Sequence, residues 1–366
     1  MSAKVKNIVL ISMVSLFIAG FFLWSIFKPC DERSVSERRN LAQFPEMSTD
    51  NIVSGKFMTD FESFSLDQFP LRNQFRTIKA FTSFYVLGQK DNSNIYVSGG
   101  YASKLEFPIN YDALDYAAGR FSYVYDSFLK GTDSKVYVSV IPDKNMFLAG
   151  ENGYPSMDYN EFSQYFEKVC DFAQYIDIMP QLEISDYYAT DTHWRQEKIV
   201  KIADFLSQNM GVKLDEKYTE KSVSQPFYGV YYGQSALPLP SDTIKYLDSE
   251  MLESCTVYDY ETAKEMPVYD LEKCDGDDPY EMFLGGSKSL ITIENKNAKT
   301  DKELIIFRDS FGSSLAPLLA EGYSKITLVD IRYISPSVLD KFIDFNGQDV
   351  LFIYSTLVLN NSITIK

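Results

Sequence analysis

Apolar strands and amphipathic helices alternate along this chain from about residue 80, and this alternation limits the fold more than any other feature. The stretches at 94–99 and 135–142 are β-branched and apolar, which is typical of strands. Residues 303–330 contain a strand, a short helix and a second strand, and have the length of a βαβ unit. The alternation predicts an α/β fold with a mainly parallel sheet flanked by helices on both faces. Apolar residues recur at helical spacing at Leu114, Ala117, Phe121, Val124 and Phe128, at Phe162, Phe166, Val169 and Phe172, and at Ile199, Ile202, Ala203 and Leu206.

Residues 8–27 contain no charged side chain. Twenty residues at about 1.5 Å each span about 30 Å, the thickness of a bilayer core. The run is longer than the apolar region of most signal peptides and ends without a clean cleavage site, so we expect an uncleaved signal anchor. Basic residues flank the run on both sides, which leaves its orientation open on charge alone. The simplest topology has a cytoplasmic tail at 1–7, a transmembrane helix at 8–27, a juxtamembrane arm at 28–79 and an extracytoplasmic domain at 80–366.

The alternation stops between residues 213 and 300, where Tyr, Asp and Glu are frequent, and we expect an irregular acidic insertion there. Residues 269–281 hold six acidic side chains, but their spacing is not that of an EF-hand, which favours a solvated loop over a calcium site. The four cysteines form no CxxC pair, so a zinc cluster is not expected. Cys255 and Cys274 are either joined across a loop or free.

The chain has a net charge of −16, which argues against nucleic-acid binding.

Ser310 is separated by two residues from the predicted strand at 303–307 and lies between this strand and the predicted helix. Ligands of open α/β sheets bind at the carboxyl ends of the strands, where the N–H groups of the following helix can stabilise an oxyanion. This position suits a nucleophile. It also suits a helix N-cap, which would use the same hydroxyl oxygen to accept from a main-chain N–H. Both interpretations remain open for this stretch alone.

His193 is the only histidine of the chain and lies in "DTHW", residues 191–194. A serine nucleophile needs a base that titrates near neutral pH, so a Ser–His mechanism in this chain would use His193. Asp191, expected at the start of a helix, is placed to accept from the imidazole Nδ1–H and fix its tautomer. The alternative is local, with Asp191 or Thr192 capping the helix and His193 exposed in its first turn.

Taken together, several stretches resemble the DHHW family and, more broadly, the alginate O-acetyltransferases of the SGNH-hydrolase-like group. The similar blocks follow the family order from about residue 35 to the C-terminus. They are "SERRNLAQFP" (37–46), "SGKFMTDFESFSLDQFPLRNQF" (54–75), "IPDKNMF" (141–147), "DTHW" (191–194), "FYG" (227–229), "YEMFLGG" (280–286), "FRDSFGSSLAPLL" (307–319) and "TLVDIRYI" (327–334).

The resemblance implies a catalytic triad of Ser310, His193 and Asp191 in an SGNH-like domain with circularly permuted strand order. Thr192 stands where the family carries its first histidine, and Arg308 stands where the acetyltransferases carry a glycine. The N–H groups of Ser310 and Phe311 are candidate oxyanion donors. Further oxyanion or substrate candidates are Asn145, which is also typical of a turn, Arg332, which also suits a salt bridge to Asp330 or Asp309, and Trp194 and Arg308.

The same resemblance implies a bacterial O-acetyltransferase, anchored in the cytoplasmic membrane, that modifies a cell-envelope or exopolysaccharide glycan. Its acetyl donor would be a membrane-bound O-acyltransferase partner, and no metal or cofactor is required. The same triad would serve a carbohydrate esterase, which differs in whether water or a sugar resolves the acyl-enzyme. A non-catalytic glycan-binding or scaffold protein of the envelope is the alternative that Thr192 and Arg308 motivate.

Overall fold

The computed structural model describes residues 2–366, which divide into two compact units. The anchor unit contains residues 2–93 and 232–238, and the sheet unit contains residues 94–231 and 239–366. The division after Ser93 assigns residues 80–93 to the anchor unit, whereas we predicted from sequence that the second domain begins at residue 80.

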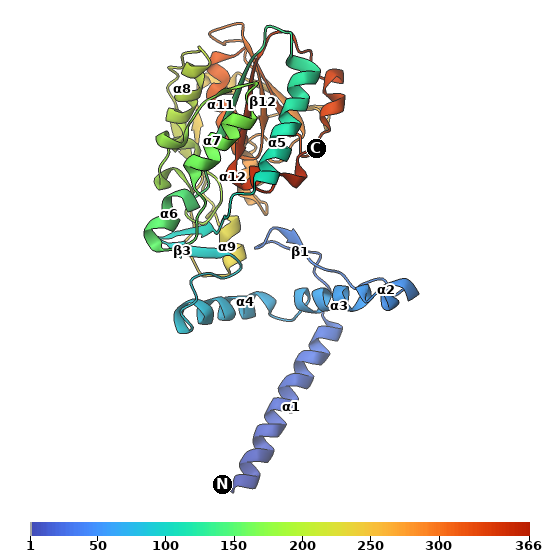
Figure 1. Ribbon diagram of the computed structural model, residues 1–366. Helices are drawn as coiled ribbons and strands as arrows, with labels where there is room; N and C mark the ends of the chain where they lie inside the picture. Colours follow the sequence, from blue (N-terminus) through green and yellow to red (C-terminus); the bar gives the residue numbers. More distant parts are fainter. Residues whose placement is uncertain (1) are drawn as a thin grey trace. The chain divides into compact units, whose positions relative to one another are not determined.

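The anchor unit begins with helix α1 (Ala3–Phe27), which is long and apolar enough to cross a membrane. None of its side chains is buried, and only Phe21 is partly covered, so most of its apolar surface is exposed. The helix is consistent with a signal anchor or with a signal sequence. Short elements follow, shown in blue in Figure 1: β1 (Arg33–Ser34), β2 (Arg39–Asn40), α2 (Thr49–Val53), α3 (Lys56–Asp67), α4 (Arg72–Phe81) and a π-helical turn (Thr82–Val86).

The sheet unit is built on an eight-stranded sheet in the order β10-β9-β11-β13-β12-β14-β5-β6. The five strands from β13 to β6 pair in parallel, which confirms the mainly parallel α/β sheet predicted from sequence. Their bounds are β5 (Lys135–Ile141), β6 (Gln174–Tyr175), β12 (Glu303–Arg308), β13 (Lys325–Val329) and β14 (Asp349–Ser355). Their carboxyl ends share one edge of the sheet, so the residues after β12 and β5 lie at the same edge.

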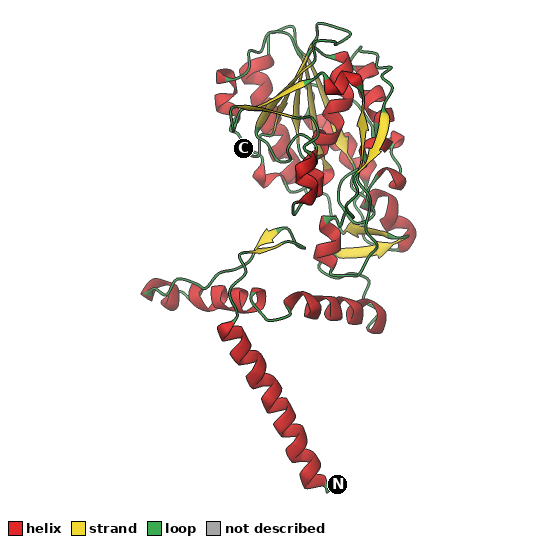
Figure 2. Ribbon diagram, turned by 180° about the vertical axis from the view of Figure 1, so that it is seen from behind, coloured by secondary structure: helices red, strands yellow, loops and turns green. Residues whose placement is uncertain are grey.

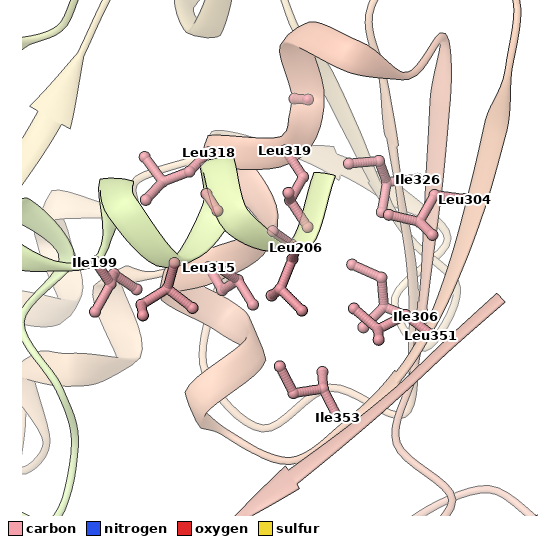
Figure 3. Close-up of a cluster of buried hydrophobic side chains, with 14 of the residues drawn as sticks. Ile199, Leu206, Leu304, Ile306, Leu315, Leu318, Leu319, Ile326, Leu351 and Ile353 are labelled. Carbon is pink, nitrogen blue, oxygen red and sulfur yellow. The ribbon is translucent and has the colours of Figure 1, made fainter. Parts of the chain in front are cut away.

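Helices cover both faces of this sheet, as Figures 1 and 2 show. Successive strand residues alternate between the faces, so Ile306 joins one core and Phe307 the other. One core packs the sheet against α8 (Val200–Asn209) and α11 (Phe311–Leu319), and Figure 3 shows its Leu and Ile side chains interdigitating. The other core packs it against α5 (Tyr111–Val124), which continues as a π-helical turn to Leu129, and α7 (Tyr159–Val169).

Residues 213–300 are more regular than predicted. Strands β9 (Thr256–Asp259), β10 (Lys264–Met266) and β11 (Leu290–Glu294) extend the sheet with antiparallel pairing. The expectation of an irregular insertion is therefore wrong for this part. Cys255 and Cys274 are both free thiols. Strands β3 (Ile95–Ser98) and β4 (Tyr101–Lys104) form a separate hairpin. The other α-helices and strands of the described residues are α6 (Asn145–Asn152), β7 (Thr219–Ser222), α9 (Val230–Ser235), β8 (Lys245–Asp248), α10 (Glu250–Glu253) and α12 (Thr356–Leu359).

Candidate active site

Ser310 lies in the tight turn between β12 and α11. Ser310 occupies the N-cap position of α11, but its backbone is already helical and its side chain makes no capping hydrogen bond, so the predicted capping role of its hydroxyl is wrong. The carboxylate of Asp309 closes the turn: one oxygen accepts from the N–H of Phe311 at 3.0 Å and the other from the N–H of Ser355 at 2.8 Å. Asp309 therefore holds the turn to the end of β14 and leaves the Ser310 hydroxyl available.

Residues 187–194, which we call the site loop, carry the other two predicted residues. Tyr187 and Trp194 pair as an isolated antiparallel bridge, and the N–H of Tyr188 donates to the carbonyl of His193 at 3.1 Å. The loop is thus a closed turn, and the expectation that Asp191 starts a helix is wrong, because α8 begins only at Val200.

The site loop and the serine turn meet in a continuous chain of hydrogen bonds. His193 Nε2 lies 2.7 Å from Ser310 Oγ, and His193 Nδ1 lies 2.6 Å from Asp191 Oδ1. Asp191 is fully buried and His193 is 6% exposed, whereas Ser310 is partly exposed. With Nδ1–H donating to the carboxylate, Nε2 is the acceptor for the serine O–H. The three side chains have the geometry that a serine nucleophile, its general base and an orienting acid require.

The start of α9 fixes the Asp191 carboxylate from the opposite side. The N–H of Val230 donates to Asp191 Oδ2 at 2.8 Å, so both carboxylate oxygens have donors. Gly229 comes so close that a Cβ built on it would lie 2.3 Å from Asp191 Cα. Only glycine allows this approach, which explains the use of "FYG" at this point of the sequence.

The buried Lys144 and the partly exposed Asp242 hold the backbone of the site loop. Lys144 Nζ donates to the carbonyls of Tyr188 at 2.9 Å and Ala189 at 3.1 Å. The Asp242 carboxylate accepts from the N–H groups of Ala189 and Thr190, each at 2.8 Å. Burial lowers the pKa of Lys144 to about 7, although Asp191, Asp242 and Asp143 favour its charged form. Neither Lys144 nor Asp242 was identified from the sequence.

Tyr280 covers one face of the His193 ring. The two rings are stacked, with centroids 3.9 Å apart and planes within 9° of each other. The Tyr280 hydroxyl lies 2.7 Å from Ser314 Oγ, which also accepts from Trp194 Nε1 at 2.9 Å. Burial raises the pKa of Tyr280 well above its usual value, so the phenol stays neutral. Tyr280 lies in the block "YEMFLGG", but we did not predict a role for this tyrosine from the sequence.

The backbone and amide donors predicted for an oxyanion differ in their availability. The N–H of Phe311 is bound to Asp309, and the N–H of Ser310 has no acceptor anywhere in residues 2–366. The Asn145 side-chain amide donates to the carbonyls of Pro155 at 3.2 Å and Glu106 at 3.4 Å. The structure therefore leaves Ser310 N–H as the available donor and engages Asn145 elsewhere.

The two candidate arginines both lie within the fold. Arg308 is fully buried and donates to the carbonyl of Asp309 at 3.3 Å, while its Nε and Nη2 have no partner among the described residues. Its aliphatic part occupies the space beside Gly312, where a Cβ would come within 2.7 Å of Arg308 Cβ. Arg332 forms a bidentate pair with Asp330 at 2.9 and 2.6 Å, which is the salt bridge given as its alternative. Trp194 is fully buried.

No protein-family model matches the chain, and no curated protein matches it in sequence. Among solved structures, a DHHW family protein from Eubacterium siraeum has a TM-score of 0.60 at 20% identity, over 75% of this chain and 95% of that chain. Bacillus cereus PatB1 with a sulfonyl adduct has a TM-score of 0.57 at 19% identity, over 72% of this chain and 95% of that chain. A further structure of PatB1 has a TM-score of 0.55 at the same identity, over 72% of this chain and 96% of that chain. The structural comparison agrees with the motif resemblance, since this chain is similar in fold to the DHHW family protein and to PatB1.

Proposed function

We propose that this protein is a membrane-anchored, extracytoplasmic O-acetyltransferase that modifies a glycan of the cell envelope or an exopolysaccharide. The observation that carries the proposal is the hydrogen-bonded chain from Asp191 through His193 to Ser310. Its hydroxyl end is partly exposed and its carboxylate end is fully buried, as a site that receives substrate at the serine requires. The proposal also rests on the ordered motif blocks and on α1 as the anchor.

The reaction would proceed through an acetyl-serine. Ser310 Oγ attacks the acetyl carbonyl carbon while its proton passes to His193 Nε2, and Ser310 N–H stabilises the oxyanion. The tetrahedral intermediate collapses, and the donor's leaving oxygen takes the proton from His193. A sugar hydroxyl then gives its proton to His193 and attacks the carbonyl carbon of the acetyl-serine. The second tetrahedral intermediate collapses, the bond to Ser310 Oγ breaks, and Oγ takes the proton from His193. The sugar leaves as the acetyl ester. Asp191 stabilises the imidazolium throughout and takes up no proton.

The partners of this reaction follow from its chemistry and from the motif resemblance. The acceptor would be a glycan hydroxyl, and the donor would be a membrane-bound O-acyltransferase that passes acetyl groups across the membrane. The chain order Asp191, His193, Ser310 supports a circularly permuted arrangement of the SGNH-like sheet, since an ordinary SGNH hydrolase has its serine block first.

A carbohydrate esterase is the second candidate, and the partial exposure of Ser310 favours it, because water can reach an acetyl-serine there. The departures that motivated a non-catalytic protein leave the hydrogen-bonded chain intact. Thr192 Oγ1 lies 3.2 Å from the Tyr231 hydroxyl, and Arg308 is buried beside Gly312, so neither separates His193 from Ser310.

Covalent labelling of the full-length protein in nanodiscs tests the nucleophile. A fluorophosphonate or sulfonyl fluoride should add once to the wild type, as measured by intact-mass spectrometry. The adduct should be absent from Ser310→Ala, and its rate should fall on the order of 10⁴-fold or more in His193→Ala and Asp191→Asn. The buried, neighbouring Ser313→Ala is the matched control and should label like the wild type. Equal labelling of Ser310→Ala would show that the covalent mechanism is wrong.

Product analysis separates transferase from esterase. The wild type, an activated acetyl ester and an oligosaccharide acceptor should give an acetylated oligosaccharide that Ser310→Ala does not form. Free acetate as the sole product at saturating acceptor would instead identify an esterase.

A further inference from the structure

The anchor unit has an exposed apolar face on the side of α4 opposite to its ion pairs. The face lies where α3 leads into α4 and continues along α4. Its residues on α4 are spaced by four and then three positions, so they share one side of the helix. Each exposes between 39% and 60% of its surface. We call this set the apolar face; it consists of Phe69, Leu71, Phe75 and Ile78.

The opposite side of α4 is polar and faces the interior of the anchor unit. Arg72 pairs with Glu37 at 2.5 Å, and Arg76 donates to the carbonyl of Gly233 at 2.9 Å and lies 3.2 Å from Glu37. Ala80, four residues further on, is fully buried. A water-exposed helix buries its apolar side and exposes its polar side, so α4 has the reverse arrangement.

The membrane-spanning candidate α1 rests on this same face. The ring of Phe21 stacks on Phe69 with centroids 5.6 Å apart, and it meets Phe75 edge-on at 5.8 Å. Both views of the ribbon show the end of α1 beside the junction of α3 and α4 (Figures 1 and 2). Phe21 lies six residues before the end of α1 at Phe27, which is about 9 Å along the helix axis. If α1 spans the bilayer, the apolar face therefore lies near the outer boundary of the hydrocarbon core.

The charge of this segment permits contact with a membrane surface. Residues 28–93 contain nine basic and nine acidic side chains, although the whole chain carries a net charge of −16. An anionic lipid surface repels the bulk of such a chain but does not repel a charge-balanced segment.

We propose that the apolar face lies in the outer interface of the lipid bilayer, with its rings and aliphatic side chains among the acyl chains next to the headgroups. Interfacial helices bury their apolar side about 5–10 Å into this boundary, which matches the depth set by Phe21. The protein is then held by two contacts, the spanning α1 and the interfacial α4. The inference rests on the anchor of the proposed function and not on its acyl chemistry.

Lipid-depth quenching of a fluorescent label tests the inference in the full-length protein. Cys30, the exposed cysteine, is replaced by serine, and an environment-sensitive dye is attached at Ile78→Cys. Asn73→Cys on the polar side of the same helix is the matched control, and the parent without a new cysteine gives the background. In phosphatidylcholine–phosphatidylglycerol vesicles, nitroxide lipids labelled near the headgroup should quench the Ile78 label at least about 3-fold more than the Asn73 label, and aqueous iodide should do the reverse.

Three outcomes would overturn the inference. Equal iodide quenching at the two positions would place the apolar face in water. An Ile78 label shielded from iodide but not quenched by nitroxide lipids would show that protein, such as a second copy of the chain, covers it. A label at Leu16→Cys, in the middle of α1, that deep nitroxide lipids do not quench would overturn the anchor together with this inference. Failure of Ser310 labelling affects neither, so the two proposals fail separately.

Discussion

At the scale of single residues, Tyr280 holds the ring of His193, the base of the candidate triad, although Tyr280 lies in neither the site loop nor the serine turn. Tyr280 lies flat on the imidazole of His193, and its hydroxyl is fixed by Ser314. The ring restricts His193 to the plane in which Nε2 points at Ser310. Its π face would also favour the positive charge that the proposed reaction places on His193.

Removing this ring should slow the reaction of Ser310 while leaving the hydrogen-bonded chain in place. A stacked aromatic pair contributes about 0.5–1.5 kcal/mol, which corresponds to about 2- to 10-fold in rate. We expect this decrease in labelling rate for Tyr280→Leu. Tyr280→Phe keeps the stack and should label within about 2-fold of the wild type. Equal rates for Tyr280→Leu and the wild type would limit Tyr280 to a packing role.

The sequence indicated Ser310, His193 and Asp191 as candidates, because they lie in short motifs and because the chain contains one histidine, and the structure brings the three side chains together. The sequence was not sufficient for Tyr280, Lys144 and Gly229. Each of these contacts the site from a segment that is distant in sequence. All three lie in blocks that resemble the family, but a block does not show what the side chain contacts. For example, Gly229 is required because Asp191, far from it in sequence, occupies the space of a side chain.

At the scale of elements, the site loop depends on a lysine that is costly to bury. Lys144 on the strand-to-helix turn between β5 and α6 keeps the carbonyls of Tyr188 and Ala189 in place. Its pKa is lowered to about 7 by burial. The unfolded chain, in which the lysine has its ordinary pKa near 10.5, therefore holds more protons than the folded chain between these two pH values.

Lys144 should accordingly make the free energy of unfolding rise with pH between about 7 and 9, by at most about 1.4 kcal/mol per pH unit. Urea unfolding at several pH values measures this slope. Lys144→Met should abolish the contribution, whereas the exposed Lys198→Met should retain it. The same slope in Lys144→Met and the wild type would mean that another group titrates in this range.

Which strands join the sheet was predicted only in part. The strand–helix–strand unit of β12, α11 and β13 was found because its pairing is local. Strand β14 has all seven residues buried, so it lacks the alternation of a half-buried strand and was overlooked. Strands β9 to β11 were overlooked because they are rich in polar residues, and their place in the sheet depends on distant partners.

At the scale of the whole molecule, the two units differ in how much apolar surface they bury. The sheet unit has a core on each face of its sheet, whereas Leu41, Pro45, Pro70 and Ala80 are the only buried apolar side chains among residues 2–93. The helices of the anchor unit therefore gain little stability from internal packing.

Hydrogen exchange in nanodiscs should separate the units. Amides of β5, β12 and β14 should exchange at least about 10³-fold more slowly than those of α2, since the strands open only by global unfolding. Low concentrations of urea should accelerate exchange in the strands and leave α2 unchanged. Similar exchange rates and urea responses in α2 and β12 would instead indicate one cooperative unit.

The bond from Ser355 to Asp309 also has a consequence for biosynthesis. Asp309 accepts from Phe311 within the serine turn and from Ser355, which is made 46 residues later, so the link from the turn to β14 forms last. A nascent or truncated chain that contains Ser310 but not β14 thus has the serine turn without this link. The position of Ser310 is therefore completed only when the last strand joins the sheet, so a chain that ends before Ser355 lacks one of the two bonds that fix the serine turn.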